Sequence, residues 1–224
     1  MDSEKTTPKA KPEKQIRKTM SIGNIYSKKF KTLELDGIWK DVLGEIEASG
    51  CWLVWGSDKN GKTRLAITLA KYLSGKHKVL YVSAEEGYSL NLQNICKWAD
   101  ISPKDRNFNL LDYEELKDLK ERLRKRNAPQ IVFIDNITFY HDELKYGGVR
   151  ELMKEFSKTI FVFLAHEQKG EPYTSTAKMV NKLSSAIMYI KGLSCHVSGR
   201  VPGGTVVIDE EKAKLFHGQK IINQ

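Results

Sequence analysis

The 224-residue sequence has few cysteines and no long apolar run, and both shortages limit what kind of protein it can be. Its three cysteines, Cys51, Cys96 and Cys195, are odd in number and show no CxxC or other metal-ligand spacing. We therefore expect reduced thiols and no structural zinc site. The longest apolar runs, such as 131–134 and 160–165, are too short to span a bilayer, and the N-terminus carries no apolar signal segment. These absences indicate a cytoplasmic protein with no membrane partner.

Positive charge is concentrated near the N-terminus. The net charge is +9, and residues 1–31 hold nine Lys or Arg against three acids. The first 20 residues contain two prolines and no core-forming periodicity, so we interpret residues 1–32 as a basic, disordered leader. Such a leader can attract nucleic-acid phosphates through counterion release, or it can serve only to keep the chain soluble. The charge alone does not decide between these alternatives.

Strand-like and helix-like segments alternate from residue 33 onward, which predicts one α/β domain over residues 33–224. The expected strands are rich in Val, Ile and Phe and lie at 51–56, 78–83, 108–111, 130–135, 159–165 and 186–191. The expected helices lie at 61–74, 88–99, 113–127, 147–158 and 175–185. Apolar strands separated by helices are typical of a mainly parallel sheet flanked by helices. The last segment, 193–211, contains a Pro-Gly-Gly turn and predicts an antiparallel β-hairpin at the sheet edge.

The segment GSDKNGKT, residues 56–63, matches the phosphate-binding pattern G-x-x-x-x-G-K-[ST] without a mismatch. It lies between a predicted strand and a predicted helix, where backbone N–H groups and the positive helix end can bind phosphates. We expect Lys62 to contact the β- and γ-phosphates of ATP and the Thr63 hydroxyl to coordinate Mg²⁺. The alternative is a glycine-rich turn that only caps a helix. The candidate nucleotide-binding residues are Gly56, Ser57, Asp58, Lys59, Asn60, Gly61, Lys62, Thr63 and Arg64.

Acidic residues follow two of the buried strands. Asp135 ends the run IVFI, at the strand end where ligands gather in open α/β sheets, so we expect it to hold Mg²⁺ with Thr63. Its alternative role is to cap the next turn. Glu85 and Glu86 end the run VLYVSA, and packing does not require two acids there. We expect Glu85 to be the general base that activates water and Glu86 to be structural. Alternatively, both acids only interact with the dipole of the next helix.

The order of these motifs resembles that of the RecA-like ATPases. GSDKNGKT is followed by YVSAEEG after one helix and by IVFIDN two strands later. That superfamily includes the RecA and RadA recombinases, the DnaB-type helicases and the KaiC-type ATPases. The resemblance covers roughly residues 33–210 and implies a RecA-like P-loop NTPase core in which Glu85 activates the attacking water.

The same resemblance implies roles for two residues nearer the C-terminus. His166 ends the strand after Asp135, where many relatives have a Gln that senses the γ-phosphate. Arg200, in HVSGRVPGG, matches an arginine that reaches the γ-phosphate bound by a neighbouring subunit, although Ser198 stands where relatives have Lys. A satisfied strand-end histidine and a solvated hairpin arginine are the alternatives. The catalytic candidates are thus Glu85, Lys62, His166 and Arg200.

Two segments that follow the Asp135 and His166 strands, 136–148 and 166–178, are expected to be loops. In recombinases and helicases of this superfamily, such loops grip single-stranded DNA. Lysines beside tyrosines suit phosphate contact and base stacking, although surface loops are often polar without a ligand. The residues concerned are Tyr140, His141, Lys145, Tyr146, Lys169, Tyr173 and Lys178.

Taken together, these patterns predict an ATP-binding and ATP-hydrolysing RecA-like protein that assembles into a ring or filament. The expected partner is single-stranded DNA, in recombination, repair or replication, and the expected cofactors are ATP and Mg²⁺. The alternative is a KaiC-type switch, in which the nucleotide controls oligomerisation and the target is a protein partner without DNA.

Overall fold

The computed structural model describes residues 19–209, and the chain divides between Phe30 and Lys31 into two compact units. In the first unit, residues Ile22–Ser27 form the short helix α1. The Ser21 side chain starts this helix by accepting a hydrogen bond from the backbone N–H of Asn24. The interpretation of residues 1–32 as a disordered leader is therefore wrong for residues 22–27. The first 18 residues of that leader lie outside the described residues.

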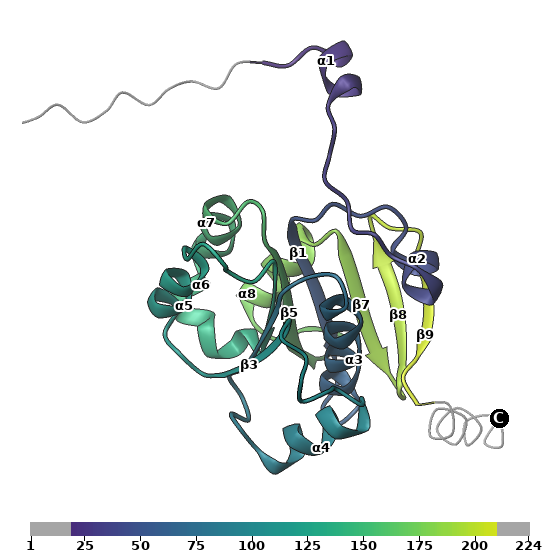
Figure 1. Ribbon diagram of the computed structural model, residues 1–224, viewed down its shortest axis with the longest axis vertical. Coiled ribbons are helices and arrows are strands. Elements are labelled where there is room, and N and C mark those ends of the chain that lie inside the picture. The colour runs from purple at the N-terminus through teal and green to yellow at the C-terminus, as the bar shows by residue number, and fades with distance from the viewer. Residues whose placement is uncertain (1–18, 210–224) are drawn as a thin grey trace, which may run out of the picture. The chain divides into compact units, whose positions relative to one another are not determined.

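The second unit is built on one mixed sheet with the strand order β3-β2-β4-β5-β1-β7-β8-β9 (Figure 1). The pairs from β3 to β7 are parallel, and those from β7 to β9 are antiparallel. The mainly parallel sheet and the C-terminal antiparallel edge are thereby confirmed. The strands of this order are β1 (Gly50–Gly56), β2 (Val79–Ser83), β3 (Phe108–Asp112), β4 (Ile131–Asp135), β5 (Ile160–Gln168), β7 (Ala186–Lys191), β8 (Ser194–Gly199) and β9 (Gly204–Val207). A ninth strand, β6 (Glu171–Pro172), pairs only with the end of β5.

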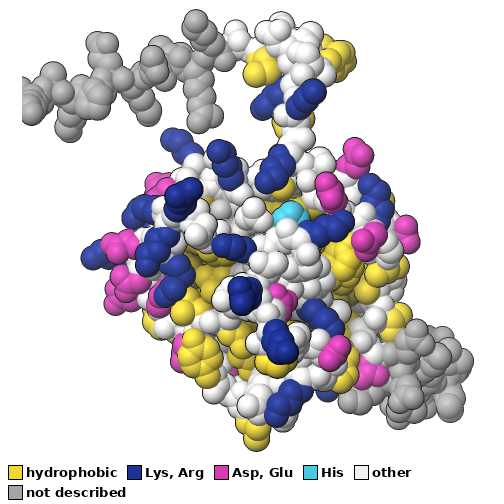
Figure 2. Space-filling view, in the orientation of Figure 1, with side chains coloured by type: hydrophobic (Ala, Val, Ile, Leu, Met, Phe, Trp, Pro, Cys, Tyr) yellow, Lys and Arg dark blue, Asp and Glu magenta, His cyan; other side chains and the backbone are white. Residues whose placement is uncertain are grey.

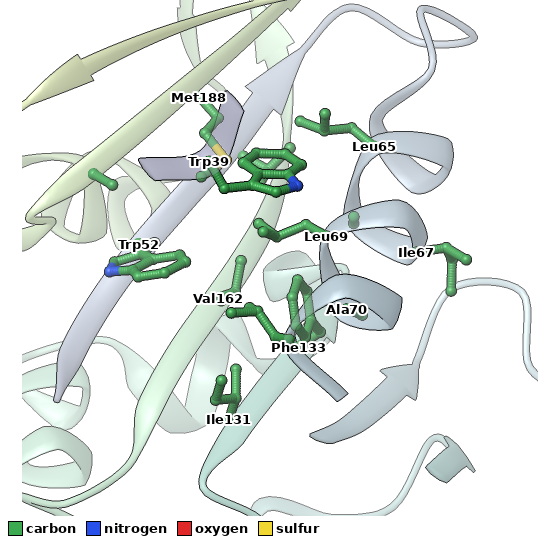
Figure 3. Packing of buried hydrophobic residues seen from close by; sticks show 14 of the residues in the cluster. Trp39, Trp52, Leu65, Ile67, Leu69, Ala70, Ile131, Phe133, Val162 and Met188 are labelled. Carbon is green, nitrogen blue, oxygen red and sulfur yellow. The ribbon is translucent and has the colours of Figure 1, made fainter. Parts of the chain in front are cut away.

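Helices cover both faces of the sheet because strand residues alternate between two apolar clusters. In β1, Trp52 and Val54 belong to one cluster, whereas Cys51 and Leu53 belong to the other. The first cluster includes α2 (Gly37–Leu43), α3 (Lys62–Ser74) and α4 (Leu90–Trp98), and Figure 3 shows Leu65 and Leu69 of α3 close to Trp39. The second cluster includes α5 (Leu116–Leu123), α7 (Gly148–Glu155) and α8 (Ser175–Leu183). No helix among the described residues is both long and apolar enough to cross a membrane.

The segment 136–148, expected to be a loop, is mostly helical. It contains a 3₁₀ helix, η1 (Ile137–Tyr140), followed directly by α6 (His141–Leu144). The prediction failed because apolar residues in this segment are buried in the second cluster. Tyr140 is fully buried, and its hydroxyl donates a hydrogen bond to the Glu114 carbonyl oxygen at 2.7 Å. Tyr140 is therefore unavailable for stacking on a base.

The strand register determines where the candidate site residues lie. Gly56 at the end of β1 is opposite His166 of β5, and Ser83 at the end of β2 is opposite Asp135 of β4. Since these strands run parallel, their carboxyl ends lie at one edge of the sheet. The phosphate-binding loop, the candidate base segment and the candidate magnesium carboxylate all follow from that edge.

Replacing Gly56 by Ala tests how tightly the start of the phosphate-binding loop is held against β7. An added Cβ would lie 2.3 Å from the Ile190 carbonyl oxygen, at a φ of +156°. Gly147→Ala is the matched control, because its φ is +105° but nothing lies within 4 Å of the added Cβ. We expect Gly147→Ala to lower the free energy of unfolding by about 1–2 kcal/mol. Gly56→Ala should lower it clearly more, as measured by urea denaturation, and equal decreases would contradict the close approach to Ile190.

Candidate nucleotide-binding site

The loop between β1 and α3 has the backbone form that phosphate binding requires. Gly61 precedes α3 in a left-handed conformation, with φ at +97°, and it has no side chain with which to cap the helix. The first N–H groups of α3 therefore remain open to an anion. An added Cβ at Gly61 would also meet Leu193 Cδ2 at 2.8 Å, so the loop needs glycine here for two reasons.

The Lys62 ammonium group lies inside this loop. Its Nζ donates hydrogen bonds to the carbonyl oxygens of Gly56 at 2.9 Å and Ser57 at 3.0 Å, and it lies 3.5 Å from Asp58 Oδ1. Only 10% of the Lys62 side chain is exposed. A buried ammonium group whose partners belong to the loop itself is well placed to neutralise phosphate oxygens bound there.

Thr63 and Asp135 form the pair of oxygen atoms expected for magnesium. The Thr63 hydroxyl donates to Asp135 Oδ2 at 3.2 Å. The same carboxylate oxygen accepts a 2.6 Å hydrogen bond from the Tyr81 hydroxyl, which is fully buried in β2. The motifs did not identify Tyr81; the only signal was a hydroxyl in an otherwise apolar run, two residues before the end of the strand. Tyr81 fixes the orientation of the Asp135 carboxylate.

Burial raises the pKa of Asp135 to about 6, although the Tyr81 hydrogen bond acts in the opposite direction. The negative charge of Glu85 adds to the increase. A bound cation would favour the charged carboxylate and offset this unfavourable burial.

Glu85 and His166 lie side by side across the site. His166 Nε2 is 3.2 Å from Glu85 Oε2, and His166 Nδ1 is 2.5 Å from Asp58 Oδ1. Asn136 Nδ2 donates to the same Glu85 oxygen at 3.1 Å. One imidazole thus links the candidate base to the phosphate-binding loop. Asn136 was not singled out in the sequence, because its contact with Glu85 exists only in the fold.

The other residues of the loop divide between structural contacts and the cavity. The Ser57 hydroxyl donates to Glu167 Oε2 at 3.0 Å, and Asn60 Oδ1 accepts from the Gly192 N–H at 3.0 Å. Both side chains hold the loop against neighbouring strands. Arg64 Nη1 donates to Asp209 Oδ2 at 3.2 Å, and its guanidinium carbon lies 5.1 Å from the centre of the Trp98 ring.

Glu86 differs from Glu85 in its partners. Its carboxylate accepts hydrogen bonds from the Ser89 hydroxyl at 3.1 Å and from Asn91 Nδ2 at 2.9 Å, both at the start of α4. This is the structural role expected for the second acid of the pair.

Arg200 does not lie in the site of its own chain. It follows β8, whose Gly199 is opposite Ala186, the first residue of β7, so Arg200 lies at the edge away from the phosphate-binding loop. Its Nη2 donates to the Leu183 carbonyl oxygen at 2.9 Å, at the end of α8. In this chain, Arg200 therefore stabilises the carboxyl end of a helix.

A cavity of about 570 Å³ lies over the phosphate-binding loop, a volume typical of ligand pockets. No group of three or more His, Cys, Asp or Glu within residues 19–209 could hold a metal by itself. Mg²⁺ does not require such a group, because it usually keeps waters and binds one or two protein oxygens plus phosphates. The Thr63 and Asp135 oxygens beside a buried Lys62 fit that requirement. The candidate residues that line the cavity are Asp58, Lys59, Gly61, Lys62, Thr63, Arg64, Glu85, Asp135 and His166.

The raised pKa of Asp135 predicts a pH-dependent effect of Asp135→Asn. Between its ordinary value of 3.8 and about 6, the folded protein binds a proton at Asp135 that the unfolded chain does not bind. Wild-type stability should therefore gain about 1.4 kcal/mol between pH 8 and pH 5 from this group, and Asp135→Asn should lack that gain. The measurement is urea denaturation at both pH values without magnesium or nucleotide. Asp41→Asn, at an exposed position of α2, should change with pH as the wild type does, and the same behaviour from Asp135→Asn would refute the assignment.

Three solved structures share this architecture at low sequence identity. The ATPase domain of a DnaB-family helicase has a TM-score of 0.53 and 16% identity, over 72% of this chain and 81% of that one. Flagellar accessory protein FlaH from Methanocaldococcus jannaschii has a TM-score of 0.51 and 16% identity, over 81% and 96%. The ATP synthase subunit NeqB from Nanoarcheaum equitans has a TM-score of 0.53 and 12% identity, over 72% of this chain but only 50% of that one. No protein-family model and no curated protein matches the sequence. All three structures are RecA-like P-loop ATPases, and this chain has their fold.

Proposed function

We propose that this protein binds Mg-ATP and hydrolyses it, with residues 33–224 as the ATPase domain. The observation that carries the proposal is that Lys62, Thr63, Asp135 and Glu85 line a single cavity. Neither Asp135 nor a buried Lys62 is explained by packing, since buried charges are costly unless they are paired or bind a ligand. The three cysteines are free thiols, which supports a cytoplasmic location.

Each polar group of the cavity has a distinct proposed role. Lys62 and the N–H groups at the start of α3 hold the β- and γ-phosphates, and Thr63 and Asp135 hold Mg²⁺. The metal ion supplies charge neutralisation at the phosphates when bound. Glu85 orients the attacking water and accepts its proton. Glu85 is positioned by Asn136 and by its own N–H, which donates to the Asp135 carbonyl oxygen at 3.0 Å.

His166 couples phosphate binding to the base. Its Nε2 lies 3.2 Å from Glu85, so a γ-phosphate oxygen that accepts a hydrogen bond from Nε2 would take the place of this carboxylate. Glu85 would then be free to accept a hydrogen bond from water. We therefore assign His166 as the residue that reports the presence of the γ-phosphate.

Two variants test the ATPase assignment. Lys62→Ala should lose nucleotide binding, because it removes the cation of the loop. Glu85→Gln should keep ATP binding but reduce turnover by about 10²–10⁴-fold, because the amide cannot accept the proton. Nucleotide binding can be followed with a fluorescent ATP analogue and turnover by phosphate release. Normal turnover in Glu85→Gln would show that another group is the base.

For the partner, we propose single-stranded DNA at the carboxyl edge of the sheet. The support is an exposed group of basic and aromatic side chains that remains after Tyr140 is excluded. Tyr146 is 96% exposed, with Lys145 Nζ 5.5 Å from its ring centre, and Tyr173 is 50% exposed. Lys169 lies exposed in the turn between β5 and β6. Rings beside ammonium groups suit base stacking and phosphate contact.

DNA dependence is tested by the ATPase rate with and without single-stranded DNA at two salt concentrations. We expect stimulation that weakens as salt rises. Tyr146→Ala should weaken DNA binding by about tenfold, corresponding to the 1–3 kcal/mol of one stacked base. Tyr146→Phe, which keeps the ring, should behave as the wild type. Hydrolysis that ignores DNA at low salt would instead favour the nucleotide-driven switch with a protein partner.

We further propose that the protein assembles into a ring or filament in which Arg200 completes the site of a neighbouring subunit. The support is its placement at the edge away from the site of its own chain, which leaves a neighbouring subunit as the place where it could meet a phosphate. Such an arginine would stabilise the charge that develops at the γ-phosphate, so hydrolysis would depend on assembly.

A further inference from the structure

Basic residues of the folded unit are concentrated in three segments that are distant in the sequence. Residues 76–78, 120–131 and 150–160 together hold ten Lys or Arg and three Asp or Glu, a net charge of +7. The other residues of 32–224 hold 18 Lys or Arg and 22 Asp or Glu, a net charge of −4. Figure 2 shows Lys and Arg side chains gathered over the part of the visible face where α5 and α7 lie. The folded unit is therefore strongly polarised although its total charge is small.

These segments surround a second cavity, of about 520 Å³, at the edge of the sheet opposite the nucleotide site. Ile131 and Ile160, the first residues of β4 and β5, form part of its lining. We call this cavity the basic groove and define it by Lys31, His77, Arg126, Glu155 and Lys158. A strand of seven residues such as β1 is about 20 Å long, so the basic groove and the phosphate-binding loop are separate sites.

The cations of the basic groove have no protein partners. Among the described residues, the side chains of Lys31, Arg126 and Lys158 are exposed and form neither an ion pair nor a hydrogen bond. The acid in the lining, Glu155, is already neutralised, since its carboxylate is paired with Lys120 at 3.3 Å and with Arg124. Three positive charges in one concave surface repel each other unless an anion lies between them.

The lining also indicates which kind of anion fits. The aromatic residue of the groove, Phe156, is only 8% exposed, so the groove offers no ring on which a base could stack. Lys78 and Lys125 are exposed and lie next in sequence to the groove residues His77 and Arg126, which extends the positive surface beyond the cavity. Several cations along a groove match an anion that repeats its charge along a chain better than one compact ion.

We propose that the basic groove binds the sugar-phosphate backbone of a nucleic acid, separately from the nucleotide site and from the Tyr146 surface. Because the groove recognises phosphates, binding is independent of base sequence and depends strongly on salt. The groove holds the nucleic acid at the edge of the sheet where the strands begin, whereas ATP is bound where they end. This proposal does not require ATP hydrolysis.

The test is binding of a labelled single-stranded 30-mer by the full chain without nucleotide, measured by fluorescence anisotropy at several salt concentrations. The double variant Arg126→Glu/Lys158→Glu should bind at least tenfold more weakly at 50 mM salt. The slope of log affinity against log salt should decrease by about 1.4, which is about 0.7 for each of two phosphates that are no longer neutralised. The matched control is Lys40→Glu/Lys97→Glu, which changes the net charge equally at exposed positions outside the groove. It should bind more tightly than the groove variant and keep most of the wild-type slope.

Two outcomes would overturn the proposal. Equal decreases of affinity in the groove and control variants, with matching urea unfolding curves, would do so because net charge alone would then explain binding. A groove variant that loses affinity for polyglutamate but keeps its affinity for DNA would do so in favour of an acidic protein partner.

A milder variant, Arg126→Gln/Lys158→Gln, guards against unfolding of the charge-reversed chain. It removes the same two cations without adding negative charge, so its slope should also decrease by about 1.4 while its affinity falls less. An unchanged slope in this variant would contradict phosphate binding by the groove. Basal ATPase activity should be unchanged in each variant, so failure of the groove proposal is distinct from failure of the ATPase proposal.

Discussion

The parallel pairing of β1 with β5 and of β2 with β4 is the constraint on which the rest of the structure depends. It brings Gly56 opposite His166 and Ser83 opposite Asp135, although these residues are separated by up to 110 positions in the chain. Parallel strands require helical crossovers, and those helices supply the two apolar clusters that bury the sheet. A sheet buried on both faces exposes its backbone only at its ends, so polar chemistry is confined to the two edges.

At the carboxyl edge, buried polar groups are arranged more tightly than folding alone would favour. Asp135 has its pKa raised to about 6 by burial, yet it retains hydrogen bonds from Tyr81 and Thr63. Lys62 is buried with only loop carbonyls and Asp58 as partners. Such a site is destabilising until a ligand of complementary charge is bound, and ligand binding then stabilises the fold. This explains why Tyr81 and Asn136, which orient the acids, matter as much as the acids themselves.

The two edges of the sheet also differ in charge. The carboxyl edge carries closely spaced acids and a few engaged cations, as expected for a metal-nucleotide site. The opposite edge carries the exposed cations that surround the basic groove. A chain with a net charge of only +3 over residues 32–224 thus presents two electrostatically distinct surfaces. Charge separation of this kind steers different anions to different sites.

The sequence alone determined the α/β class, the mainly parallel sheet, the antiparallel C-terminal edge and the identity of the phosphate-binding loop. These features depend on local periodicity and on a contiguous motif, which a linear chain displays directly. Only the tertiary structure decided that residues 137–144 are helical, since their apolar side chains are buried by distant elements. It also decided that Tyr81 holds Asp135, that His166 touches both Asp58 and Glu85, and that Arg200 lies far from its own site. The physical reason is that these contacts are made between strands and loops, and their distances are set by sheet register, which no local pattern encodes.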